Sequence, residues 1–340
     1  MAASDFVSSQ FKSLPILLKP TECQGRTFII TGANGGLGFE ATRHLVALGA
    51  ARVVMAVRNL ESGRSSKSDI EITTGRRDVL QVWHLDLASY ESVKKFVREV
   101  EEKLDRVDVL VANAGVNTGR WELTEGTESQ LTVNCISNLL LTVLMVPIMR
   151  NQKRELGIEP KIVHVGSRGA FLAAKPPHIG IDVDNIFNDL NSKQRWQTQV
   201  DDRYILTKLL QLFALRQLAT LASPSQTSVV LNITDPGLCR TGLTQNTRWQ
   251  MRLSAYIGKL MLGRSAEMGS RTILAAVAAG EESHGKFLID CEVAEDSLPG
   301  WVTSEDGKIF QQRFWGELAV RLEAIQPGCI DAVVNKTEIS

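Results

Sequence analysis

Short, continuous apolar runs alternate with longer stretches of helical apolar spacing along most of this 340-residue chain. The runs are rich in valine, isoleucine and leucine, which is typical of strands buried on both faces of a parallel sheet. Strands that alternate with helices predict right-handed β-α-β crossovers, so we expect a doubly wound parallel α/β sheet. The predicted strands are 28–31, 51–57, 79–84, 107–112, 161–165, 228–234 and 286–290 (a short edge strand), and the predicted helices are 39–48, 89–104, 130–149, 204–221, 265–279 and 310–324.

The segment 26–50 joins the first predicted strand to the first predicted helix through a turn with glycines at 32, 35, 36 and 38. Glycine permits positive φ and lets the backbone approach a bound group closely. A helix that starts at such a turn directs free N–H groups and its positive dipole end at the turn, where a pyrophosphate fits. The segment therefore predicts a dinucleotide site in a Rossmann-type fold, with a tight turn that binds nothing as the alternative.

Composition is that of an ordinary globular protein. Apolar residues make up 44% of the chain, charged residues 22%, and the formal net charge is zero, which argues against binding to nucleic acid or to an anionic membrane. Five scattered cysteines without a C-x-x-C pair indicate reduced thiols rather than disulfides or a metal site. The sequence has no pattern typical of a secretory signal, and its longest apolar run, 139–149, is too short to span a bilayer. We therefore expect a cytoplasmic protein without a membrane span.

The residue after the second predicted strand bears on the choice of cofactor. In a dinucleotide fold an acidic residue there would bind the adenosine ribose and repel a 2′-phosphate, whereas an arginine would accept that phosphate. This chain has Arg58 and no acidic residue beside it. NADP(H) is therefore favoured over NAD(H), with a solvent-facing arginine of no special function as the alternative.

Four polar residues stand out later in the chain. Ser167 follows the strand 161–165 closely, and ligands bind at the carboxyl ends of open parallel sheets. Tyr204 and Lys208 are four residues apart at the start of a predicted helix, so they lie on one face, one turn apart. Asn134 lies inside an apolar helix, where an amide is costly to bury unless it is hydrogen-bonded. Pairing with the backbone would be sufficient to explain that asparagine.

Taken in this order, the features resemble the short-chain dehydrogenase/reductase family over about residues 24 to 300. Within it the chain is most similar to the retinol-dehydrogenase-like and fungal ketoreductase branches. The glycine turn has that family's T-G-x-x-x-G-x-G spacing, beginning at Thr31, rather than G-x-G-x-x-G. The resemblance implies one Rossmann-type domain at 25–300, with an N-terminal extension, 1–24, packed on its outside and a C-terminal helical extension, 301–340.

The resemblance also implies roles for the four polar residues. Tyr204 would be the general acid. Lys208 would bind the cofactor ribose and, together with the positive charge of the oxidised nicotinamide, lower the pKa of that tyrosine. Ser167 would bind the substrate oxygen, and Asn134 would anchor a water behind the lysine. The implied cofactor contacts are Thr31, Gly32, Asn34, Gly36, Leu37, Gly38, Arg58, Asp86, Leu87, Asn113, Ala114, Gly115, Tyr204, Lys208, Pro236, Gly237 and Thr241.

The chain departs from the family pattern in two places. Ala112 takes the first position of the usual N-N-A-G, which removes one side-chain contact expected to stabilise the strand. Ser167 precedes Tyr204 by 37 positions, more than is usual in the family, and the insertion 168–203 would account for the difference. Because this insertion lacks clear periodicity, we expect a loop that walls the substrate pocket. Asp86 has a second interpretation, as the N-terminal cap of the helix 89–104.

The resemblance predicts an NADPH-dependent reductase of a hydrophobic ketone or aldehyde, by reversible hydride transfer, in secondary metabolism. The segment 242–262 corresponds to the substrate lid, and its aromatic and methionine residues suit a bulky apolar substrate, although a packed core helix would show the same spacing. A retinoid or steroid alcohol dehydrogenase is an alternative, and so is a non-catalytic NADP(H) sensor or scaffold. Family habit implies a homodimer through helices 130–150 and 204–221, which the terminal extensions would block if they cover those helices.

Overall fold

A single twisted sheet forms the centre of the protein in the computed structural model, which describes residues 3–172, 178, 180–222 and 229–334. Within those residues eight strands follow the order β10-β9-β8-β7-β4-β1-β2-β3, and every neighbouring pair is parallel except β9 with β10. The expected doubly wound fold is confirmed. The strands are β1 (Thr27–Thr31), β2 (Arg52–Val57), β3 (Leu80–His84), β4 (Val109–Ala112), β7 (Lys161–Val165), β8 (Val230–Asp235), β9 (Phe287–Ile289) and β10 (Glu292–Val293).

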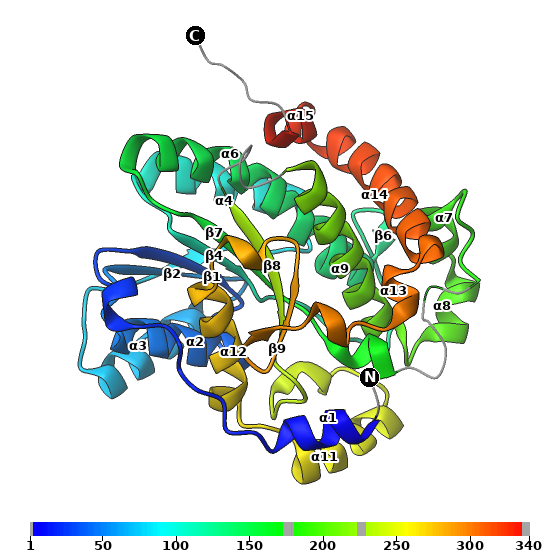
Figure 1. Ribbon diagram of the computed structural model, residues 1–340, viewed down its shortest axis with the longest axis horizontal. Coiled ribbons are helices and arrows are strands. Elements are labelled where there is room, and N and C mark those ends of the chain that lie inside the picture. The colour runs from blue at the N-terminus through cyan, green and yellow to red at the C-terminus, as the bar shows by residue number, and fades with distance from the viewer. Residues whose placement is uncertain (1–2, 173–177, 179, 223–228, 335–340) are drawn as a thin grey trace.

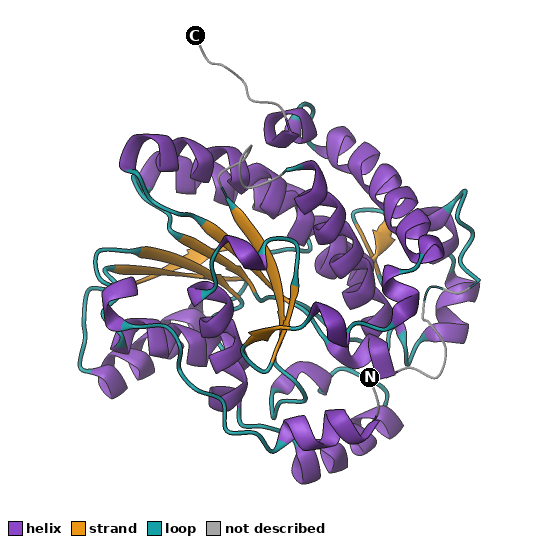
Figure 2. Cartoon of the chain, in the orientation of Figure 1, coloured by secondary structure: helices purple, strands orange, loops and turns teal. Residues whose placement is uncertain are grey.

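Helices cover both faces of this sheet, as Figures 1 and 2 show. One layer is formed by α2, α3 and α12, and the other by α4, α6 and α9. Beyond the second layer, α14 packs on α9 and α15 packs on α6. The helices are α2 (Gly36–Ala47), α3 (Leu60–Thr74), α4 (Tyr90–Lys103), α6 (Asn138–Leu156), α9 (Arg203–Leu221), α12 (Ala266–Ala278), α14 (Glu305–Ile325) and α15 (Cys329–Val334).

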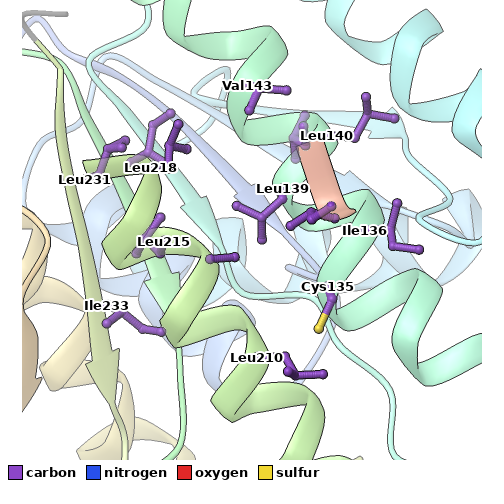
Figure 3. Close-up of a cluster of buried hydrophobic side chains, with 14 of the residues drawn as sticks. Cys135, Ile136, Leu139, Leu140, Val143, Leu210, Leu215, Leu218, Leu231 and Ile233 are labelled. Carbon is purple, nitrogen blue, oxygen red and sulfur yellow. The ribbon is translucent and has the colours of Figure 1, made fainter. Parts of the chain in front are cut away.

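The central strands are buried on both faces because their runs are apolar throughout. All residues of β1, β4, β7 and β8 are buried. One apolar cluster lies on each side of the sheet. Figure 3 shows part of the larger cluster, where Leu139 of α6 points toward Leu215 of α9. The five cysteines are buried free thiols.

A continuous helical stretch runs from Ser129 to Leu156. It begins with α5 (Ser129–Leu131), passes through the π-helical turn η2 (Thr132–Ser137) and continues as α6. The stretch is long and apolar enough to cross a membrane by length and composition, but 83% of its most apolar window is buried inside the protein. Its apolar composition is therefore explained by its place in the core.

Several elements differ from the sequence expectation. Helix α3 was not expected, because only Gly63, Ser66 and Ile70 on it are buried, so its apolar periodicity is weak. β9 is not an edge strand, since β10 pairs with its outer side. The N-terminal segment packs deeper than expected: Ser9 and Gln10 of α1 (Ala3–Gln10) are buried. The remaining short elements are the hairpin β5 (Leu123–Thr124) with β6 (Thr127–Glu128), the helices α7 (Ile186–Leu190), α8 (Lys193–Gln199), α11 (Trp249–Leu262) and α13 (Gly300–Thr303), and the 3₁₀ turns η1 (Pro20–Glu22), η3 (Arg168–Leu172), η4 (Gly242–Thr244), η5 (Glu281–Ser283) and η6 (Glu295–Ser297).

The insertion 168–203 is not a single loop. Its described residues include η3, α7 and α8, and the backbone N–H groups of Ile186 and Phe187 donate to the Glu317 carboxylate of α14 at 2.7 and 3.0 Å. The start of α7 is thus bound to the C-terminal helix α14, whereas Arg168 and Gly169 at the beginning of the insertion line a cavity at the carboxyl edge of the sheet. Residues 173–177 and 179, which belong to the same insertion, lie outside the described residues.

Candidate active site

The glycine turn between β1 and α2 is shaped to admit a bound group. Gly36 has φ of 54°, which favours glycine. A Cβ on Gly38 would lie 2.5 Å from the Gly32 carbonyl oxygen and 2.6 Å from the Asn113 side-chain nitrogen. The first turn of α2 can therefore approach β1 only without a side chain at Gly38, and its N-terminal N–H groups face the turn. These features fit the pyrophosphate of a dinucleotide.

Thr31 holds the ends of β1 and β4 together. Its hydroxyl oxygen accepts hydrogen bonds from the backbone N–H groups of Asn113 and Ala114 at 3.0 and 2.9 Å. The Asn113 side chain donates to the Thr31 carbonyl at 2.8 Å. Thr31 is fully buried, so it shapes the turn and does not line the cavity beside it. The asparagine contact also ties these strands together although Ala112 replaces the usual first asparagine.

Tyr204 and Lys208 lie one turn apart on α9. The Lys208 ammonium nitrogen is 5.9 Å from the centre of the tyrosine ring and donates to the Val165 carbonyl at 2.7 Å and to the Gln211 side-chain oxygen at 3.1 Å. Burial lowers the pKa of Lys208 to about 8. The pKa of Tyr204 is raised, because burial and the nearby Asp235 carboxylate disfavour the phenolate. The expected lowering of the tyrosine pKa includes the charge of an oxidised nicotinamide, whereas the protein groups by themselves raise it.

Asn134 lies in the π-helical turn η2. Its side-chain oxygen accepts from the Val116 N–H at 2.8 Å, and its side-chain nitrogen donates to the Val116 carbonyl at 2.9 Å and to the Thr207 hydroxyl at 3.0 Å. A Cβ on Gly115 would be 3.1 Å from the Asn134 oxygen and 3.7 Å from the Lys208 nitrogen. The asparagine is thus satisfied by backbone partners and also lies beside the lysine, so both interpretations of this residue retain support.

Ser167 lies two residues beyond β7. Its hydroxyl accepts from the Gly169 N–H at 3.2 Å, and the backbone N–H of the next residue, Arg168, donates to the Asp235 carboxylate at 2.9 Å. The same carboxylate accepts from the Gly237 N–H at 3.0 Å. Asp235 thereby connects the serine turn to the Pro-Gly turn after β8.

One cavity of about 670 Å³ brings these parts together at the carboxyl edge of the sheet. A second cavity, of about 750 Å³, shares Gly115, Asn117 and Gly242 with it and extends to Arg58. Thirteen of the predicted catalytic and cofactor-binding residues line the first cavity: Gly32, Asn34, Gly36, Leu37, Asn113, Ala114, Gly115, Ser167, Tyr204, Lys208, Pro236, Gly237 and Thr241.

The other predicted residues lie around this space. Arg58 is exposed and lines the second cavity. The Asp86 carboxylate accepts from the Ala88 N–H at 2.9 Å, next to that cavity, while Leu87 is buried in the core. Ser89 rather than Asp86 caps α4, since its hydroxyl accepts from the Ser92 N–H.

Gln211 and His164 extend the polar chain behind Lys208 and were missed in the sequence. The Gln211 side chain donates to His164 Nδ1 at 3.0 Å, and His164 Nε2 is 2.8 Å from the Thr142 hydroxyl. Burial lowers the pKa of His164 to about 3, so the ring is neutral near pH 7. The available signals were a histidine inside a buried strand and a glutamine three residues after the lysine on the same helix.

The segment 242–262 presents its apolar side chains outward. Trp249 is 64%, Tyr256 64% and Met261 68% exposed on α11. Of this segment Gly242, Leu243, Thr244, Gln245 and Lys259 line the first cavity. The alternative of a packed core helix is wrong, since α11 has no buried residue, and Trp249, Tyr256 and Met261 do not line that cavity.

Comparison with known proteins identifies the family. The chain is 39% identical over 326 residues to the "Short chain dehydrogenase/reductase dmxR8" of Cryptosporiopsis sp. (strain 8999), covering 95% of this chain and 98% of that protein. The chain belongs to the short-chain dehydrogenase/reductase family. A second short-chain dehydrogenase, anuD of Penicillium roqueforti (strain FM164), is 36% identical over 334 residues, covering 96% of this chain and 85% of that protein. The expected membership, with fungal relatives, is confirmed.

Two further comparisons agree with this membership. The sequence profile described as short chain dehydrogenase matches residues 26–175 of this short-chain dehydrogenase/reductase. The crystal structure of a 3-ketoacyl-(acyl-carrier-protein) reductase from Brucella melitensis complexed with NADH superposes with a TM-score of 0.54 at 20% identity, covering 78% of this chain and 96% of that one. At that identity the superposition shows a shared fold only.

Proposed function

We propose that this protein is an NADPH-dependent reductase of a bulky hydrophobic ketone or aldehyde. The observation that carries the proposal is the single cavity in which the glycine turn meets Ser167, Tyr204 and Lys208. A glycine turn alone would serve a sensor or scaffold as well. The hydroxyl pair and the buried lysine at the same place are what a carbonyl reductase requires.

The chain's own residues can handle the oxygen of a carbonyl group. Reduction makes that oxygen negative, and a nicotinamide cofactor, when bound, supplies the hydride. The hydroxyl of Ser167 would donate a hydrogen bond to the oxygen, and Tyr204 would give it a proton. Because burial raises the pKa of Tyr204, its phenol is in the acid form near pH 7. The Lys208 ammonium stabilises the phenolate that proton transfer leaves behind.

The surroundings of Arg58 support NADP(H) as the cofactor. Its side chain is exposed on the second cavity, directly after β2, where the adenosine ribose of a Rossmann-bound dinucleotide lies. Among the described residues no ion pair engages Arg58. Its guanidinium is thus free to bind a 2′-phosphate. We expect Arg58→Ala to lower kcat/KM for NADPH by about tenfold or more, while kcat/KM for NADH stays within about twofold.

The test is oxidation of NADPH and of NADH by the purified protein with a panel of apolar ketones, aldehydes and quinones. The proposal expects NADPH to be consumed with at least one of them and Tyr204→Phe to lose this activity. An enzyme that works chiefly in the reverse direction on retinoid or steroid alcohols would instead reduce NADP⁺ with those alcohols. Binding of NADPH without turnover of any carbonyl or alcohol would favour a non-catalytic sensor. A preference for NADH would refute the role given to Arg58.

A further inference from the structure

A buried group of four charges lies beside the candidate active site. Arg168 and Asp290 follow the strands β7 and β9, Asp235 is the last residue of β8 between them, and Arg264 precedes α12. Arg168 binds Asp235 at 2.8 Å and Arg264 binds Asp290 at 2.7 Å. Both arginine side chains are at most 2% exposed. Charges buried this far are costly unless they are paired, so this group is a fixed part of the structure.

The first helix, α1, is bound to this charge group. The Ser9 hydroxyl donates to the Asp290 carboxylate at 2.6 Å and accepts from the Arg168 guanidinium at 2.6 Å. The Gln10 side-chain oxygen accepts from the Leu238 N–H at 3.0 Å, next to the Pro-Gly turn. Ser9 and Gln10 are 4% and 5% exposed. The helix, dark blue at the bottom of Figure 1, is therefore held by the charge group through Ser9 and by a backbone N–H through Gln10.

One turn before Ser9, Phe6 lies over the same arginine. The Arg168 guanidinium carbon is 5.0 Å from the centre of the phenyl ring, within the range of a cation–π contact. Phe6 is half-buried and lines the cavity that contains Ser167 and Tyr204. An aromatic ring packed on one side and open to a cavity on the other offers an apolar surface to a ligand there.

We propose that α1 forms a wall of the substrate pocket and that Phe6 is a specificity-determining residue, which packs against the apolar part of a bulky carbonyl substrate. The substrate class in this proposal rests on the proposed function; the position of the wall does not. Ser9 acts as a positioning residue, since it binds the charge group and touches no substrate. In this proposal α1 is part of the active site rather than of an outer extension.

The kinetic test compares Phe6→Ala with a matched control on the same segment. Phe11→Ala removes an equal side chain that is 69% exposed just after α1. Phe6→Ala should lower kcat/KM for an aromatic ketone such as 2-acetylnaphthalene by about tenfold, mainly through KM, and change kcat/KM for butanone by less than about twofold. Phe6→Leu should recover part of the loss. Ser9→Ala should also lower kcat/KM for 2-acetylnaphthalene more than for butanone. Equal losses for both ketones, with Phe11→Ala unchanged, would reduce Phe6 to a structural support.

A second measurement does not depend on turnover. Benzophenone, an aromatic ketone that couples to nearby C–H bonds on irradiation, is incubated with the full-length protein, and the labelled peptides are identified by mass spectrometry. The proposal expects label within residues 3–10, retained in Tyr204→Phe and lost with excess 2-acetylnaphthalene. Label confined to other segments, or label within residues 3–10 that excess 2-acetylnaphthalene does not reduce, would contradict the proposal that α1 forms a wall of the pocket. If α1 is labelled but no ketone is reduced, the pocket wall stands and the proposed reductase function falls.

Discussion

At the scale of single residues, the chemistry depends on how burial sets the charge of Lys208. The folded protein holds this lysine at a pKa of about 8, below its ordinary 10.5, because water is excluded from its nitrogen. The ammonium is the form that donates to the Val165 and Gln211 oxygens, and in the proposed mechanism it also stabilises the Tyr204 phenolate. Loss of its proton should therefore affect activity at a lower pH than for an exposed lysine.

We expect the rate of carbonyl reduction to fall as the pH rises through about 8, as Lys208 becomes neutral. The free energy of unfolding should instead rise over the same pH range. Between pH 8 and the unfolded pKa the unfolded chain binds more protons than the folded one, so the contribution of this residue to stability rises with pH, by at most about 1.4 kcal/mol per pH unit.

Two experiments check the opposite trends. A pH profile of kcat from 6 to 10 should show the fall, and urea unfolding of the wild type against Lys208→Met at pH 8 and 10 should show the wild type gaining relative to the variant. An activity that is flat across this range would contradict the role of the ammonium.

At the scale of elements, the close approach of α2 to β1 depends on a single missing side chain. Gly38→Ala would place a methyl group 2.5 Å from the Gly32 carbonyl, which is backbone and cannot move aside cheaply. We expect a loss of about 1–3 kcal/mol in the free energy of unfolding and weaker binding of NADPH, because the turn must open. Urea denaturation and a fluorescence titration with NADPH measure the two effects.

The matched control is Gly316→Ala in the middle of α14. No atom lies within 4 Å of a Cβ at that glycine, and alanine favours a helix over glycine by about 1 kcal/mol. This variant should therefore be slightly more stable, with unchanged NADPH binding. If both alanine variants are stabilised, the tight contact between α2 and β1 is less important than the geometry indicates.

At the scale of the whole molecule, the C-terminal helices decide which surfaces are free. α14 packs on α9 and α15 on α6, and the buried Arg150 guanidinium donates to the Ala332 carbonyl at 2.9 Å. α6 and α9 are the helices through which the family resemblance implies a homodimer. Because they are already covered, we expect a monomer of 37.4 kDa in multi-angle light scattering at micromolar concentration. A dimer would contradict this expectation and would have to form through a surface other than α6 and α9. If deletion of residues 305–340 converted such a dimer to a monomer, its interface would lie on α14 and α15.

The local pattern of apolar residues predicted much of the fold. Most features that it did not predict depend on packing between segments far apart in the sequence. The strands of the sheet other than β10, and its covering helices other than α3, follow from apolar runs, whereas the meeting of Tyr204 with the glycine turn was implied by the family resemblance. Sequence did not reveal that α7 binds Glu317 or that Ser9 reaches Asp290, because each contact joins positions more than 100 residues apart. The outward apolar face of α11 was missed for a different reason: helical spacing identifies a face but not the side on which it lies.

The contact between Ser9 and Asp290 can form only late in the synthesis of the chain. These residues are 281 positions apart, so α1 leaves the ribosome long before the end of β9, where it must bind. The segments of the cofactor half, from β1 to β4, are available to fold early, since domains form from the N-terminus as they emerge. We therefore expect a nascent chain that stops before residue 290 to form its glycine turn but not the contact that holds α1 in place.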